Sequence, residues 1–488
     1  MENKDLIQSK IDEALLNFKK ARYQNAIDIL EKLDEKKTNF LICWYLGHSY
    51  FRIYDYFSAI KYIKKSIELK EPDELNQNFL AEILLQSNQY NEAIKLFEKV
   101  LTINEKNINA LFNIGKIYSE LGKFKIAEKY YNKIIKEDSY NFNAFYELIK
   151  LDKKYLSENL IRDINDFMIK NNQDHINKTY ASLILAEKEK STQNYEFELN
   201  NLIKGHQYFI EKKEKASFQE FNYFTNLLPQ FIKKIESIDF KIKSEIHPIF
   251  IMGLPRSGTT MIENLICSSE NKIIKGDETG IMGKVFFSKK IISNYDDKNL
   301  NVNFDFDEKG LNVLKNLIIN QYNQIGIDTS KSFFTDKSLE NFLYIKILYK
   351  IFPKAKFIYC KRNYTANLIG ILKVFLPNLL WSHSLDKIMI FMELYKNNLN
   401  EILAEKKIDL KIINLEEFSE NPIDYSKDLF KFLDLKWDKK IVDQNYGKPT
   451  IIKTVSNIQV RNKIRKHDLN YLKNYIPLLK KYGIKELT

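Results

Sequence analysis

A repeat of about 34 residues occupies the first third of the chain and limits what that part can fold into. One register is marked by four alanines with spacings of 33, 34 and 34 residues: Ala26, Ala59, Ala93 and Ala127. A second register is marked by small residues spaced by 34: Gly47, Ala81 and Gly115. Small residues at fixed places let paired helices approach closely, so the pattern predicts a stack of helix pairs.

This pattern resembles the tetratricopeptide repeat, a helix–turn–helix unit of about 34 residues. A partial fifth unit begins near Asn143, after which the period fades. The resemblance implies a helical solenoid over residues 1–155, followed by an irregular helical cap or linker over 156–244. Such a solenoid serves either as a plain scaffold or as a concave surface that binds a peptide or protein partner. The sequence leaves both alternatives open.

After His247 the pattern changes to strands that alternate with helices. "HPIFIMG" is a short apolar run that ends in glycine, and similar runs end at Lys337, Cys360 and Leu415. Strands alternating with helices predict a mostly parallel sheet covered on both faces, and therefore an α/β domain over residues 245–488. Ligands of such sheets bind beyond the carboxyl ends of the strands. Three cations are expected at this edge: Arg256, Lys337 and Arg362.

The segment from Gly253 to Thr260, "GLPRSGTT", has the glycine spacing of a phosphate-binding loop. Glycines let the backbone wrap an anion, and amide groups at the start of the following helix point toward it. A nucleotide hydrolase or kinase would carry lysine where Thr259 stands. Here the cation is Arg256, inside the loop, and no strand ends in an acid of the kind that positions magnesium. The loop is therefore predicted to hold an anion without a metal.

The loop and its neighbours resemble the sulfotransferases that use 3′-phosphoadenosine 5′-phosphosulfate (PAPS), in particular repeat-containing bacterial sulfotransferases and tyrosylprotein sulfotransferases. The resemblance implies a fold in which a P-loop-like α/β sulfotransferase domain follows the helical solenoid. It also implies a set of loop residues that bind the phosphosulfate: Arg256, Ser257, Gly258, Thr259 and Thr260. In "GDET" the catalytic base falls on Glu278, and in "TDK" the lysine at the sulfuryl bridge is Lys337.

Further cofactor contacts are implied by the same resemblance. The arginine that contacts the 3′-phosphate matches Arg362, and a late segment that closes over the nucleotide supplies three residues: Ser456, Gln459 and Arg461. The chain departs from the family pattern at three places. Gly370 stands at a cofactor-binding position where the family has serine, Leu415 replaces a tyrosine, and Tyr471 and Leu472 replace a basic residue and a tryptophan. These departures bear on PAPS affinity rather than on the type of reaction.

Sulfuryl transfer needs positioning and electrostatic stabilisation of the leaving phosphate, which Arg256 and Lys337 are expected to supply. It also needs a group that takes the acceptor's proton, which is the role expected of Glu278. The acceptor is a hydroxyl, and protein tyrosine, a glycan and a small hydroxylated molecule all stay open. Two other functions compete: a nucleotide-dependent kinase or hydrolase, and a binding scaffold whose catalytic half is inactive.

Charge, cysteine content and the lack of long apolar runs indicate where the protein is located and what it can bind. The chain has 76 Lys and Arg against 64 Asp and Glu, a net charge of +12, which suits an anionic ligand or a lysine-rich solvated surface. Its three cysteines are far apart, so neither a disulfide framework nor a zinc site is expected. No apolar run approaches the roughly 20 residues of a membrane span. The first residues lack the apolar core of a secretory signal. The absence of a signal and of a membrane span predicts a cytoplasmic location. No nucleic-acid partner is expected, and the oligomeric state is left open.

Overall fold

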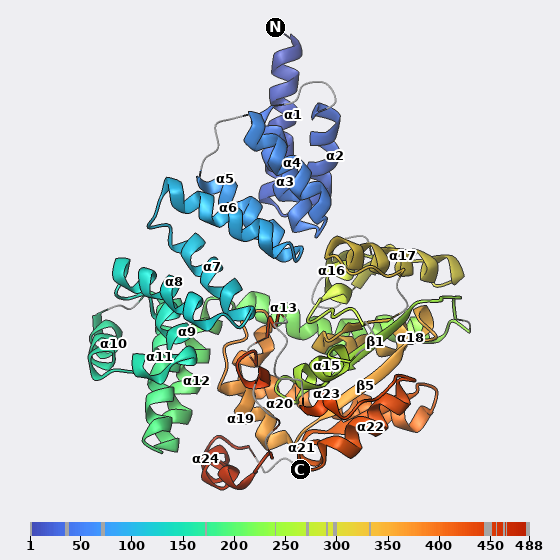
Figure 1. The fold of residues 1–488 in the computed structure, drawn as a ribbon. Helices are drawn as coiled ribbons and strands as arrows, with labels where there is room; N and C mark the ends of the chain where they lie inside the picture. Colours follow the sequence, from blue (N-terminus) through green and yellow to red (C-terminus); the bar gives the residue numbers. More distant parts are fainter. Residues whose placement is uncertain are drawn as a thin grey trace. The chain divides into compact units, whose positions relative to one another are not determined.

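The computed structural model of the 488-residue chain divides into two compact units, Met1–Ile117 with Gly280–Ser330 and Tyr118–Thr279 with Lys331–Thr488 (Figure 1). The described residues are 2–34, 39–69, 74–170, 173–239, 241–269, 273–288, 291–295, 300–330, 333–443, 451–454, 456–461, 464 and 466–484. These units group residues by packing, so the three sequence domains 1–155, 156–244 and 245–488 stay a prediction.

Paired helices build the first repeats, as the 34-residue period predicts. The pairs are α1 (Glu2–Lys19) with α2 (Tyr23–Asp34), α3 (Phe40–Arg52) with α4 (Tyr56–Leu69), and α5 (Glu74–Gln86) with α6 (Tyr90–Ile103). The alanines that mark the first register, among them Ala26, Ala59 and Ala93, are fully buried. A β-carbon on Gly47 would lie 2.5 Å from the Ile63 side chain, so a small residue is required where α3 and α4 approach.

The fourth repeat consists of α7 (Ile108–Glu120), within which the first unit ends and the second begins, and α8 (Phe124–Glu137); further helices of the second unit follow. These helices are α9 (Phe142–Leu151), α10 (Glu158–Lys170), α11 (His175–Ser191), α12 (Tyr195–Glu211), α13 (Glu214–Asn222) and α14 (Leu228–Glu236). A short π-helical segment, Tyr223–Leu227, joins the last two. The expected helical solenoid at the N-terminal end is thus confirmed.

The turn inside each of the first four repeats has one residue with a left-handed backbone. These residues have φ between 55° and 73°: Ala21, Tyr54, Asn88 and Gly122. In each turn the next amide returns to a carbonyl of the preceding helix, as from Gln89 to Leu84 at 2.8 Å and from Lys123 to Tyr118 at 2.8 Å. Such bonds satisfy carbonyls that the helix end leaves without a partner.

Residues 280–330 pack in the first unit with the repeats. This segment contains α16 (Ile281–Phe287), the antiparallel pair β2 (Ile292–Tyr295) and β3 (Leu300–Val302), and α17 (Glu308–Gln324). Gln324 accepts from the amide of Phe57 at 2.8 Å and donates to the carboxylate of Asp55 at 3.0 Å. Asn88 donates its side-chain amide to the carbonyl of Ile325 at 2.9 Å. The turns of the second and third repeats therefore hold this segment.

The second unit contains a four-stranded sheet in the order β4-β1-β5-β6. Its strands are β4 (Phe333–Asp336), β1 (His247–Met252), β5 (Lys356–Lys361) and β6 (Leu410–Asn414), and each neighbouring pair is parallel. In register, Ile249 lies opposite Thr335 on one side and Lys356 on the other. The expected parallel sheet is confirmed, with strands at all four predicted apolar runs.

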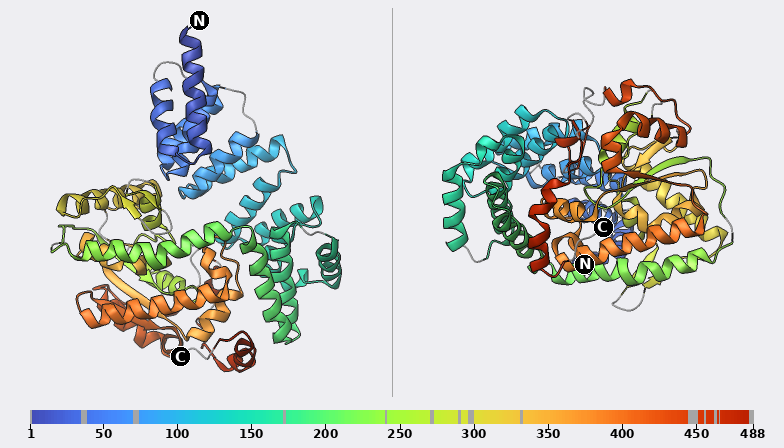
Figure 2. Two further views of the ribbon diagram at one scale, coloured as in Figure 1. Left: turned by 180° about the vertical axis from the view of Figure 1, so that it is seen from behind. Right: turned by 90° about the horizontal axis from the view of Figure 1, so that it is seen from below.

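Helices cover both faces of this sheet (Figures 1 and 2). On one face, Ile249 and Ile251 of β1 share a buried cluster with α15 (Thr259–Cys267) and α22 (Pro422–Phe432). On the other face, Tyr359 of β5 and Tyr395 of α20 (Leu385–Glu405) both pack on the ring of Phe342. Because side chains alternate along a strand, a strand buried on both sides needs a continuous apolar run, which the two central strands β1 and β5 have.

The remaining elements complete the second unit. They are η3 (Leu339–Tyr344), α18 (Ile345–Ile351), α19 (Tyr364–Leu372), η4 (Leu380–His383), α21 (Leu415–Glu420), α23 (Lys440–Asp443), η5 (Gln459–Arg461), η6 (Asn470–Asn474) and α24 (Ile476–Lys481). No helix among the described residues has both the length and the apolarity needed to span a bilayer.

Candidate active site

The loop that follows β1 turns sharply before α15 begins. Gly258, with φ of 95°, precedes the first residue of the helix, Thr259. A β-carbon on Gly258 would lie 2.7 Å from Leu415, and one on Gly253 would lie 2.4 Å from the carbonyl oxygen of Cys360. Both glycines are therefore required sterically, and Leu415, a departure from the family pattern, fills space directly against the loop.

Arg256 has a left-handed backbone with φ of 70°, which is costly for a residue with a side chain. Its guanidinium reaches the late segment predicted to close over the nucleotide, donating to the Ser456 hydroxyl and, at 2.5 Å, to Oε1 of Gln459. A second link joins the hydroxyls of Thr260 and Thr454 at 3.2 Å. We name residues 451–454 and 456–461 the strap, because they cross the loop at these points.

Arg362, just beyond β5, is a second arginine that contacts the loop. It donates from Nη1 to the carbonyl of Arg256 at 3.0 Å and lies 3.5 Å from the Tyr471 hydroxyl. Burial and the charge of Arg362 lower the pKa of the Arg256 guanidinium to about 10. Asn367 of α19 donates to the carbonyl of Pro255 at 2.7 Å and so fixes the loop. The sequence did not single out this residue.

Gly370 lies beside both arginines. A β-carbon there would be 3.1 Å from Cβ of Arg256 and 3.5 Å from Nη1 of Arg362. The absence of a side chain at this position thus leaves room for the stem of Arg256. The strap residue Arg461 extends elsewhere, donating from Nη2 to the carbonyl of Glu120 at 2.7 Å.

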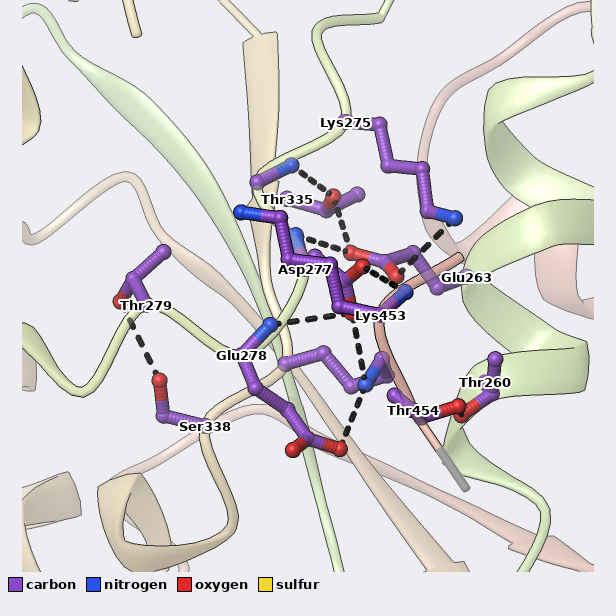
Figure 3. Close-up of polar contacts among 12 residues, drawn as sticks. Thr260, Glu263, Lys275, Asp277, Glu278, Thr279, Thr335, Ser338, Lys453 and Thr454 are labelled. Carbon is purple, nitrogen blue, oxygen red and sulfur yellow. Dashed lines mark hydrogen bonds and ion pairs between the residues drawn. The ribbon is translucent and has the colours of Figure 1, made fainter. Parts of the chain in front are cut away.

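The other flank of the site consists of the carboxylates of Asp277 and Glu278, which Figure 3 labels, and a buried lysine that pairs with both. Nζ of Lys337 lies 2.9 Å from Oε1 of Glu278 and 3.1 Å from Oδ1 of Asp277. Lys337 is fully buried, whereas 45% of the Glu278 side chain is exposed. Asp277 has a left-handed backbone, φ 63°, and receives the strap amide of Lys453 at 3.2 Å. The structure thus brings Lys337 and Glu278 together, and the strap contacts both flanks.

Two residues behind this flank belong to none of the sequence motifs. Glu263 of α15 is fully buried and accepts from the Asp277 amide at 2.9 Å and the Thr335 hydroxyl at 2.7 Å. Lys275 lies 4.0 Å from Glu263 and donates to the carbonyl of Ile451 in the strap at 3.0 Å. They hold the "GDET" turn in place, and only their burial and partners reveal it.

Charge pairing sets the protonation of this flank. Burial opposes the charge on Lys337, but Glu278 and Asp277 outweigh it and raise the pKa of the ammonium. Burial likewise opposes ionisation of Asp277, and Lys337 and Lys275 outweigh it, so the pKa of the Asp277 carboxyl is lowered. Burial and the charge of Asp277 raise the pKa of Glu263. Lys337 and Asp277 therefore stay ionised at neutral pH.

The loop flank contains buried polar atoms that no described residue satisfies. Oγ of Ser257, Nε of Arg256 and Nε of Arg362 have no hydrogen-bond partner among the described residues. Buried donors without partners are rare and costly. An anionic group with several oxygens matches this set of donors. Within the part of the chain that the structure describes, no group of three or more His, Cys, Asp or Glu side chains is placed to hold a metal ion.

Comparison with known proteins identifies two kinds of domain in the chain. A model of the sulfotransferase family matches residues 248–439, which include the loop, Glu278, Lys337 and Arg362. Models of the tetratricopeptide repeat match residues 81–122 and 108–141. The chain therefore carries a sulfotransferase-family domain together with tetratricopeptide repeats.

Individual relatives are distant. An uncharacterized protein of Aquifex aeolicus is 21% identical over 311 residues, which are 60% of this chain and 39% of that protein. A crystal structure of a sulfotransferase from Mycobacterium tuberculosis is 10% identical and covers 62% of this chain and 96% of its own, with a TM-score of 0.27. A repeat protein from Cytophaga hutchinsonii is 19% identical and covers 44% and 86%, with a TM-score of 0.33.

Proposed function

We propose that the protein is a PAPS-dependent sulfotransferase that moves a sulfuryl group to a hydroxyl acceptor. The observation that carries the proposal is the set of buried donors on Arg256, Ser257 and Arg362 that lack partners within the described chain. Phosphate and sulfate oxygens satisfy donors of this kind, and the start of α15 adds backbone amides. PAPS supplies the sulfuryl group when bound, and Arg362 is the residue we assign to its 3′-phosphate.

Lys337 and Arg256 are assigned to the charge that grows on the leaving phosphate. Each is a fixed cation, and Lys337 is held by its carboxylate partners before any ligand arrives. Cations that are already in place stabilise developing charge without the cost of reorganisation. Glu278 is assigned to the acceptor side, because its partly exposed carboxylate is open to a hydroxyl from solution while its ion pair fixes its position.

Protein tyrosine is our proposed acceptor, and recruitment of the acceptor protein is our proposed role for the repeats. Repeats of this class present an extended surface to peptides, which supports a macromolecular acceptor over a small one. A glycan is the alternative outcome of the same experiment. Transfer of label from PAPS can be measured to a library of tyrosine peptides and to glycans with free hydroxyls, with phenylalanine peptides as the control.

The cofactor is tested first by calorimetry. Adenosine 3′,5′-bisphosphate should bind without a metal, whereas ATP with Mg²⁺ should not, because threonine occupies the position of the phosphate-loop lysine. Binding of ATP with Mg²⁺ alone would favour a kinase or hydrolase. Binding of neither would leave the protein as a scaffold with an inactive catalytic half.

A further inference from the structure

The strap is held on a second side by the turn of the fourth repeat. The amide of Ile452 donates to the carbonyl of Glu120 at 3.0 Å. The side-chain amide of Asn457 donates to the carbonyl of Ser119 at 3.1 Å, and Arg461 donates to the carbonyl of Glu120 at 2.7 Å. One backbone amide and two side chains of the strap therefore reach the same two carbonyls, at the end of α7.

These carbonyls suit their partners physically. The last four carbonyls of a helix have no partner within it, and they carry the negative end of the helix dipole. A guanidinium and an amide are the groups that such an end prefers. The contact is also shielded from solvent, because Asn457, Ser119 and Ile452 are 8%, 6% and 2% exposed. Hydrogen bonds shielded from water in this way resist competition from solvent.

The fourth turn differs from the three before it in the residue at its left-handed position. The earlier turns have Ala21, Tyr54 and Asn88 there, and the fourth has Gly122. A β-carbon on Gly122 would lie 2.8 Å from Cζ of Arg461. Glycine therefore relieves the backbone and also leaves the space in which the arginine lies against the turn.

We propose that the turn Ser119–Gly122 positions the strap over the phosphate loop, so that this turn of the fourth repeat contributes to nucleotide binding. Asn457 and Gly122 are positioning residues, because they act through the strap residues Ser456 and Gln459 that contact Arg256. The expected effect on nucleotide affinity rests on the proposed function, whereas the attachment of the strap to the turn Ser119–Gly122 does not. Removal of residues 1–155 should therefore release the strap, because it removes the carbonyls of Ser119 and Glu120.

Three single variants of the full chain test this proposal. Asn457→Ala removes the amide that binds Ser119, and Gly122→Ala crowds Arg461. Asn88→Ala is the matched control, because it removes an amide-to-carbonyl bond of the same type at the equivalent turn of the third repeat. Hydrogen exchange of the Ile452 amide is measured without ligand, and the affinity for adenosine 3′,5′-bisphosphate is measured by calorimetry.

We expect Asn457→Ala and Gly122→Ala to speed exchange at Ile452 and to weaken bisphosphate binding by about 3- to 10-fold, the usual worth of one hydrogen bond. Asn88→Ala should change neither quantity. Exchange at Ile452 that stays as slow in both folded variants as in the natural chain would overturn the attachment. Faster exchange with unchanged bisphosphate affinity would overturn the positioning role. If the natural chain binds no bisphosphate, the proposed function fails, and the exchange measurement still decides the attachment.

Discussion

The two flanks of the site hold their charges differently. On the loop flank, Arg256 and Arg362 lie side by side, and Nε of Arg362 lies 4.0 Å from Oε1 of Glu416. On the other flank, Lys337 is paired with both Asp277 and Glu278. Among the described residues, the first flank has buried donors without a hydrogen-bond partner, whereas the lysine of the second flank is paired with carboxylates of the protein itself. This contrast predicts that ligand affinity depends mainly on the loop flank and turnover mainly on the carboxylate flank.

The largest expected effect tests the carboxylate flank. Glu278→Gln keeps the shape of the side chain but cannot accept a proton, so turnover should fall by about 10²–10⁴-fold. Bisphosphate affinity should stay close to that of the natural chain. Steady-state kinetics and calorimetry check the two halves of this prediction. Glu245→Gln is the control, because Glu245 is also paired with a lysine, Lys354, but lies on the surface. More than a third of the natural turnover in Glu278→Gln would exclude the base role.

The next effect tests the loop flank. Arg256→Ala removes a charged donor from a partly buried site, and bisphosphate binding should weaken by about 2–4 kcal/mol. Transfer should be lost with it. Arg162→Ala, at an exposed arginine of α10, should leave calorimetric affinity unchanged. An unaltered affinity in Arg256→Ala would remove this residue from the nucleotide site and with it the contrast between the flanks.

A smaller effect is expected from Gly370→Ala. The added methyl group would press on Cβ of Arg256 at 3.1 Å, so bisphosphate affinity should fall by roughly 2- to 5-fold. Because alanine has a higher helix propensity than glycine, the unfolding temperature of the variant should not fall. Lower stability therefore cannot explain the weaker binding. Gly370→Ser adds the hydroxyl of the family pattern and should recover part of the affinity. If Gly370→Ala binds the bisphosphate as tightly as the natural chain, the space beside residue 370 does not limit the position of Arg256.

The smallest effect concerns the pH dependence of stability near the carboxylate flank. Burial raises the pKa of Glu340 to about 7, and the nearby charges of Glu278 and Asp336 add to this. The folded state therefore binds this proton more tightly than the unfolded state, in which the pKa is near 4.5. Its contribution to stability is complete below pH 4.5 and is lost as the pH rises through 7. Glu340→Gln should flatten the decline in unfolding temperature between these values, and an unchanged decline would contradict the assignment.

Local sequence signals account for the repeats and for the strand–loop–helix order. Spacing of 34 residues places small side chains at the same point of every helix pair, and a run such as "HPIFIMG" before a glycine loop can hardly be anything but a buried strand. These patterns depend on neighbours a few residues apart, so they can be read without coordinates. The same is true of Arg256, Lys337 and Arg362, since parallel strands bring their carboxyl ends to one edge of the sheet.

The partners of these residues were decided by tertiary structure alone. Glu263 and Asn367 are ordinary residues of apolar helices, and only their burial beside the loop makes them supports of the site. The four repeat turns share one backbone shape, yet the third binds Ile325 while the fourth binds Asn457, which is 338 residues from Ser119. A turn fixes which carbonyls are exposed, because that follows from helix geometry. Which distant segment reaches them depends on how the whole chain packs, and no local pattern records it.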